Sequence, residues 1–267
     1  MATTKETLIV YRPTLAVFSV LAALGTPALA QQQGDAAPAE QTATPSEATP
    51  SEAAPSESAA VELTPAQIAA FNKAVSDFTA GQAAQQAGDN AGAVAKYDAA
   101  LPAIRAVVQA QPDKIDNVNF LANALYANAA ANGALGKMDQ VIALYEEAAP
   151  HWRKVVEAKP ADTASRNILA GLLIQLGNRK LAAQDKTGAD PLYQEALGLA
   201  RKSVAENGGD PVNRNILLSA LIGASQTGSD PALKTELLDM GKSMMADGSI
   251  DAMNRPSIEI LTGQKAG

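Results

Sequence analysis

The side chains that most often carry catalysis or bind metals are scarce in this chain. It has one histidine, His151, and no cysteine among its 267 residues. A zinc site needs several histidine or cysteine ligands, so a lone histidine does not make one. Disulfides and thiol chemistry are excluded for lack of cysteine. The sequence also contains no Gly-x-Ser-x-Gly, phosphate-loop or Gly-x-Gly-x-x-Gly motif. We therefore expect a protein that is not an enzyme and has no cofactor or bound metal.

A recurring asparagine is the best candidate for binding. Asn119, Asn167 and Asn215 follow one another at a spacing of 48 residues. Asparagine is unfavourable inside a helix, and its amide can both donate to and accept from a peptide group. One hypothesis is that these residues contact a ligand. The other is that each bonds a neighbouring helix or loop and keeps the units in register. The candidate partner-binding residues are Asn119, Asn123, Arg166, Asn167, Arg214 and Asn215.

The 48-residue spacing extends to other residue types and identifies a repeat. It relates Tyr97, Tyr145 and Tyr193, and also Arg105, Arg153 and Arg201. A fixed period of this size is typical of stacked repeat proteins, in which each unit buries its apolar face against its neighbours. Apolar residues in 119–131 recur at three- and four-residue steps, which predicts a helix, and a second helix is expected in each unit. An opening helix is predicted over 65–84, and a degraded closing unit begins near Asp230.

Glycine and proline mark the expected turns. The turns within the units are predicted at Gly88-Asp89, Gly136-Lys137 and Gly188. Between units, a proline is expected to end one helix while a nearby polar residue caps the next. These boundaries lie at Pro112, Pro160 and Pro211.

Small and aromatic residues in the first unit form a recognisable pattern. It consists of Gly81, Gly88, Ala93, Tyr97 and Ala100. This pattern resembles the tetratricopeptide repeat (TPR) family, in which small residues let two antiparallel helices approach and the aromatic ring packs between them. The resemblance covers roughly residues 64–246. It implies an all-α, TPR-like right-handed superhelical solenoid of antiparallel helix hairpins. It also implies that the first helices line a concave groove, where asparagine and basic side chains hold a peptide.

Two features depart from that family. Its repeats usually have 34 residues, whereas the period here is 48. Pro102 and Pro150 also lie inside the predicted second helices, and Gly198 takes the same place in the third unit. A proline inside a helix removes a hydrogen bond and bends the axis. The second helices are therefore expected to be either kinked or split in two.

The N-terminal part of the chain differs in composition from the repeats. Residues 1–30 have a basic start and a short apolar run, which predicts a signal peptide cleaved after Ala30. Residues 31–62 carry six acidic and no basic side chains, which predicts a disordered acidic linker rich in Pro, Ser, Ala and Glu. The predicted repeat domain, 63–267, then has a net charge of only −2, whereas the full chain has −7. We expect no nucleic-acid partner, because there is no strong basic patch, and no stable membrane span after signal cleavage.

The sequence favours an exported scaffold over a catalyst. We expect a non-catalytic, TPR-like adaptor, periplasmic or secreted, that binds a protein or peptide partner in the cell envelope. One alternative is a self-associating structural component of an envelope assembly. The other is a carrier or enzyme for envelope sugars that uses the three tyrosines as an aromatic track. Those tyrosines match the internal packing position of the TPR family, which favours a core role for them.

Overall fold

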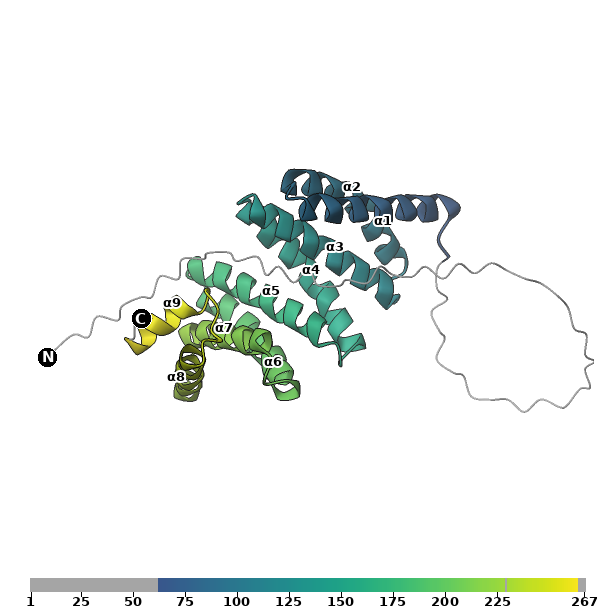
Figure 1. The fold of residues 1–267 in the computed structure, drawn as a ribbon. Coiled ribbons are helices and arrows are strands. Elements are labelled where there is room, and N and C mark those ends of the chain that lie inside the picture. The colour runs from purple at the N-terminus through teal and green to yellow at the C-terminus, as the bar shows by residue number, and fades with distance from the viewer. Residues whose placement is uncertain (1–61, 229, 264–267) are drawn as a thin grey trace, which may run out of the picture. The chain divides into compact units, whose positions relative to one another are not determined.

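The structure, a computed structural model, describes residues 62–228 and 230–263. The predicted signal peptide and all but the last residue of the predicted linker lie outside the described residues. The described part of the chain is helical and contains no strand (Figure 1). Its nine helices are α1 (Pro65–Gln86), α2 (Asn90–Ala110), α3 (Ile115–Ala134), α4 (Met138–Ala158), α5 (Thr163–Ala182), α6 (Lys186–Glu206), α7 (Pro211–Thr227), α8 (Pro231–Ala246) and α9 (Arg255–Thr262).

Each of these helices packs against the next one along the chain, and all nine belong to one compact unit. Two additional pairs are in contact, α1 with α3 and α5 with α7. The prediction of an all-helical fold is confirmed for the described residues. The opening helix is also where the spacing of apolar residues predicts it, although α1 extends two residues further, to Gln86.

Aspartate side chains fix where several helices begin. Asp89, Asp162 and Asp185 are the N-caps of α2, α5 and α6. Each accepts a hydrogen bond from the backbone amide three residues later, at 2.8, 3.1 and 2.8 Å respectively. Such caps satisfy amides that the first turn of a helix leaves without a partner. The start of α4 differs, because its N-cap Lys137 supplies no side-chain hydrogen bond.

The turn between α5 and α6 lies four residues before the position that the sequence predicts. The turns between α1 and α2 and between α3 and α4 contain Gly88 and Gly136, with φ of 82° and 71°. The residue 48 positions after Gly136 is Gln184, which also has a positive φ, of 63°. Gly188 instead lies inside α6, so its prediction as a turn residue is wrong. A left-handed conformation costs a non-glycine residue roughly 1–2 kcal/mol. Packing of α5 on α6 must offset this cost at Gln184.

The second helices run without a break through their internal prolines. Pro102 lies within α2 and Pro150 within α4, and α6 likewise continues through Gly198. The alternative in which these helices split in two is therefore wrong. Both prolines are exposed. The carbonyl group that loses its helical donor can therefore be hydrated, and the packed turns on either side keep the helix continuous.

The three periodic tyrosines are buried among the helices. The exposed fraction is 0% for Tyr97, 6% for Tyr145 and 0% for Tyr193. Close approach to these rings requires glycine, because a Cβ added to Gly81 would lie 2.6 Å from Tyr97 Cε1. One added to Gly223 would lie 2.1 Å from Tyr193 Cε1. The core role of the tyrosines is confirmed, and their rings form no aromatic track on the surface.

Candidate functional site

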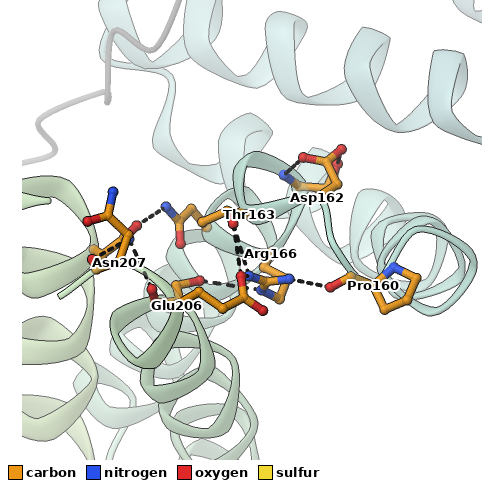
Figure 2. A network of polar contacts seen from close by, with 10 residues as sticks. Pro160, Asp162, Thr163, Arg166, Glu206 and Asn207 are labelled. Carbon is orange, nitrogen blue, oxygen red and sulfur yellow. Dashed lines mark hydrogen bonds and ion pairs between the residues drawn. The ribbon is translucent and has the colours of Figure 1, made fainter.

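Arg166, one of the six candidate residues, is buried near the start of α5. Its side chain is only 1% exposed. Nη2 donates to Thr163 Oγ1 at 3.0 Å and also contacts the carboxylate of Glu206. Nη1 donates to the backbone carbonyl of Pro160. Figure 2 shows the guanidinium group between these three partners.

These contacts connect the beginning of α5 to the end of α6. Glu206 is the last residue of α6, and Thr163 Oγ1 donates to its carboxylate at 3.2 Å. A buried guanidinium without a counter-charge would cost several kcal/mol, so Glu206 and the surrounding acceptors make the burial of Arg166 tolerable. A ligand could reach Arg166 only if this cluster opened.

Asn167, the neighbour of Arg166, bonds to the following unit. Its Nδ2 donates to Asn213 Oδ1 on α7 at 2.7 Å. Asn213 in turn donates to the carbonyls of Ser203 and Asn207, both at 3.1 Å. Both carbonyls also accept from a backbone amide, so Asn213 adds a second donor to each of them at the end of α6. Asn167 Oδ1 is buried and has no hydrogen-bond partner among the described residues.

Asn215 and Arg214 hold the last hairpin together. Asn215 Nδ2 donates to the carbonyls of Pro211 and Ser249, both at 2.8 Å, and its Oδ1 accepts from the amide of Asp251 at 2.9 Å. Arg214 Nη1 lies 3.0 Å from a carboxylate oxygen of Asp247, the C-cap residue of α8. Arg214 therefore connects the start of α7 to the end of α8, as Arg166 connects α5 to α6.

Asn119 and Asn123 bond to each other along one face of α3. Asn123 Nδ2 donates to the carbonyl of Asn119 at 2.9 Å and to its Oδ1 at 3.1 Å. Asn123 is 9% exposed, and its own Oδ1 is a second buried acceptor with no partner in the described part of the chain. The side-chain bonds of these two asparagines stay within one helix.

The structure thus distributes the six candidate residues over three hairpins. Asn167 connects two units, and so does Asn215, which accepts from Nδ2 of Asn254, the N-cap of α9. Both arginines are engaged in ion pairs within their own hairpins. These contacts support a register-keeping role for Arg166, Asn167, Arg214 and Asn215. Ligand contact stays a prediction, and it is best supported at the two unpartnered amide oxygens, Asn123 Oδ1 and Asn167 Oδ1.

The sequence reasoning missed the glutamates that pair with the periodic arginines. On the exposed side of the second helices, Arg105 of α2 binds Glu147 of α4 through two bonds, of 2.6 and 2.8 Å. Arg153 of α4 binds Glu195 of α6 in the same way, at 2.7 and 2.8 Å. In each pair the glutamate raises the pKa of the arginine.

A third pair, Arg201 with Glu236 at 2.5 Å, continues the series from α6 to α8. The signal for the first two pairs was present in the sequence, because Glu147 and Glu195 share the 48-residue spacing. The last pair breaks that spacing, since Glu236 follows Glu195 by 41 residues. The closing unit is shorter by seven residues, and a strict search at 48 would miss it.

The described residues offer no metal site of three or more histidine, cysteine or acidic side chains. Within the same ranges, no helix has the length and apolar character needed to cross a bilayer. A scan against protein-family models finds no match, and a search of curated proteins finds no similar sequence. Arguments about function therefore rest on the residues themselves.

Proposed function

We propose that this chain is a non-catalytic scaffold that binds an extended protein or peptide segment along the first helices of its units. The observation that carries the proposal is the pair of buried, unpartnered acceptors, Asn123 Oδ1 on α3 and Asn167 Oδ1 on α5. A buried acceptor without a donor costs about 1–3 kcal/mol. Both oxygens are closed to solvent, so backbone N–H groups of a bound segment would supply the missing donors and recover that free energy once the amide groups turn toward it.

A TPR-like, right-handed superhelix is the arrangement that goes with this proposal. The contacts of α1 with α3 and of α5 with α7 support it, because they place first helices beside first helices of the following unit. Stacking of this kind creates an extended surface for a partner. The tyrosines packed against Gly81 and Gly223 add support, since the TPR resemblance implies this use of small residues.

The proposed place of action is the cell envelope, with the protein periplasmic or secreted. This part rests on the basic and apolar pattern of residues 1–30, which lie outside the described residues. Intact mass spectrometry of the exported protein checks it. A mature chain that begins at Gln31 is expected, and retention of Met1 would count against export by cleavage.

The test of binding compares the mature chain with an Asn119→Ala/Asn123→Ala double variant in quantitative affinity enrichment from native envelopes. These two asparagines bond only to each other's groups among the described residues, so their loss should leave the hairpins packed. Asn72→Ala, at an exposed position of α1, is the matched control. Helicity and melting temperature should be equal in all three proteins.

A partner that the parent and the control capture, and that the double variant loses, would support binding along the first helices. Equal capture by all three proteins would move the binding surface elsewhere. Failure of the parent to enrich any partner above an unrelated bait would count against the scaffold itself.

Self-association is the second candidate function. The observation that favours it is Ile260, which is 63% exposed on α9 near the end of the described chain. A single exposed apolar side chain is common on monomers, so Ile260 marks where a contact between copies would lie and does not by itself show one. Sedimentation velocity of the parent and of Ile260→Lys separates the cases. A parent that remains monomeric at high concentration would exclude this candidate.

A further inference from the structure

A cavity of about 550 Å³ lies where α2, α3 and the start of α4 meet. Pockets that hold small molecules are typically about 300–1,000 Å³ in volume. Asp98 of α2 and Asn128 and Asn132 of α3 line one side, and Val94 and Leu144 provide apolar surface. The cavity is separate from the proposed peptide surface, because Asn128 follows Asn123 by five residues, which turns it by about 140° around α3.

The polar side of the cavity is a directed chain of hydrogen bonds. Asn132 Nδ2 donates to Asn128 Oδ1 at 2.8 Å, and Asn128 Nδ2 donates to Asp98 Oδ1 at 2.7 Å. Asn128 and Asn132 are 1% and 4% exposed. Two acceptors remain, Asn132 Oδ1 and Asp98 Oδ2, and neither receives a hydrogen bond from the described part of the protein. This wall therefore offers an accessible amide oxygen on a buried residue and an exposed carboxylate to a donor, preferably a cationic one.

The repeat architecture does not require these two buried asparagines. At the 48-residue spacing, Asn128 corresponds to Leu176, which is buried, and Asn132 corresponds to Lys180, which is exposed. Asparagine is a weaker helix former than leucine, and its burial costs free energy that leucine would not. Asparagine replaces these residues only in the unit that lines this cavity. A role in ligand binding therefore explains Asn128 and Asn132 better than packing does.

The cavity lining at the start of α4 carries one basic and one acidic side chain. Lys137, Asp139 and the rest of the first turn of α4 line the cavity here. Lys137 forms no ion pair within residues 62–228 and 230–263, whereas Asp139 forms an exposed ion pair with Arg179 at 3.1 Å that offsets part of its charge. No side chain caps α4 at this end. The amides of a helix N-terminus and a free lysine together favour a carboxylate.

We infer that this cavity binds an apolar α-amino acid in its zwitterionic form. The ammonium group lies against Asp98 and Asn132, and the carboxylate against Lys137 and the first turn of α4. The apolar side chain packs on Val94 and Leu144. This site goes beyond the proposed scaffold function and does not depend on it, since its ligand is a small molecule and its residues lie on a different face of α3.

Isothermal titration calorimetry of the mature chain with L-leucine, L-methionine and L-phenylalanine tests the inference. N-acetyl-L-leucine lacks the ammonium group and L-leucinamide lacks the carboxylate, so each should bind roughly tenfold or more weakly than L-leucine. Leucyl-leucine carries the same two charges further apart, so its affinity relative to that of L-leucine shows whether the site prefers a free amino acid or a peptide. Tighter binding of the dipeptide would overturn the assignment to a free amino acid.

Two substitutions at repeat-equivalent positions provide the matched comparison. Asp98→Gln removes the carboxylate at an exposed position, and glutamine is the residue that the third unit has there, at Gln194. Glu146→Gln removes the same charge at the equivalent exposed position outside the cavity lining. Asp98→Gln should weaken L-leucine binding about tenfold, whereas Glu146→Gln should leave it unchanged, with equal melting temperatures.

Three results would overturn the inference. They are the absence of binding heat with all three amino acids at millimolar concentration, equal binding of the two blocked derivatives, and equal effects of the two substitutions.

Discussion

Asn167 on α5 donates its side-chain amide to Asn213 Oδ1 on α7 across 2.7 Å, and so joins two consecutive first helices. Asn213 passes the connection on, because its own amide donates to the carbonyls of Ser203 and Asn207 at the end of α6. One pair of asparagines therefore links three helices. The remaining acceptor, Asn167 Oδ1, is buried and has no partner among the described residues.

Replacement of Asn213 by alanine should destabilise the protein. The carbonyls of Ser203 and Asn207 would each lose one of two donors and keep a backbone amide, whereas the buried amide of Asn167 would lose its acceptor. We expect a loss of about 1–3 kcal/mol in the free energy of unfolding. Urea denaturation measures it, with the exposed Gln194→Ala as the control, for which a change within about 0.5 kcal/mol is expected. A loss for Asn213→Ala as small as the control's would show that the linkage contributes little.

The two kinds of ion pair should differ in their value to stability. Glu206→Ala removes the counter-charge of Arg166, whose side chain is 1% exposed, and we expect a loss of about 2–3 kcal/mol. Glu236→Ala breaks the pair with Arg201, in which the side chains are 38% and 47% exposed, and should cost less than about 1 kcal/mol. Urea melts at low and high salt compare them. The loss of stability in Glu236→Ala should vanish at high salt, and the loss in Glu206→Ala should persist. Equal losses for the two variants would contradict the expectation that burial decides the contribution of an ion pair.

The glycines beside the buried tyrosines should not accept a methyl group. In Gly223→Ala the new Cβ would lie 2.1 Å from Tyr193 Cε1, so the ring or α7 must move, at a cost of about 1–3 kcal/mol. Gly198→Ala is the control, since a Cβ there meets nothing within 4 Å inside the continuous helix α6. It should stabilise the protein by about 0.5–1 kcal/mol, because alanine loses less backbone entropy than glycine. Thermal melts that shift in the same direction for both variants would refute the packing argument.

Stability should decline in alkaline solution through the tyrosines. Burial raises the pKa of Tyr97 to about 12, from an ordinary value of 10.0. The folded state therefore favours the neutral phenol. This contribution is fully present below pH 10 and is lost as the pH rises from there through about 12. For one such group the loss is at most about 1.4 kcal/mol per pH unit.

Urea melts of the parent and of Tyr97→Phe at pH 8, 10 and 11 check this expectation. Phenylalanine cannot ionise, so the variant should lose less stability between pH 8 and 11 than the parent does. The variant also loses the bond from the Tyr97 hydroxyl to Gln85, of 2.9 Å, which lowers its stability at every pH. Parallel pH profiles for the two proteins would show that ionisation of Tyr97 is not coupled to unfolding.

Much of the fold could be predicted because its signals are local. Helix starts follow from polar caps such as Asp89, and the period of Tyr97, Tyr145 and Tyr193 indicates stacked units and their core. The prediction for Gly188 failed because glycine is not the only residue that can adopt a positive φ. Packing of α5 on α6 holds Gln184 in that conformation, and no local pattern shows this.

For the candidate site, the sequence could predict which residues are involved but not which partners they contact. The sequence by itself determined which positions carry asparagine and arginine in register, together with the scarcity of catalytic side chains. Tertiary structure alone decided that Arg166 is buried against Glu206, that Asn167 reaches Asn213, and that the residues around Asn132 line an open cavity. The physical reason is that helical periodicity sets the direction of a side chain only within its own helix. Its partner lies on another helix, some 40 residues away in the sequence. The distance and rotation of that helix depend on packing along the whole interface.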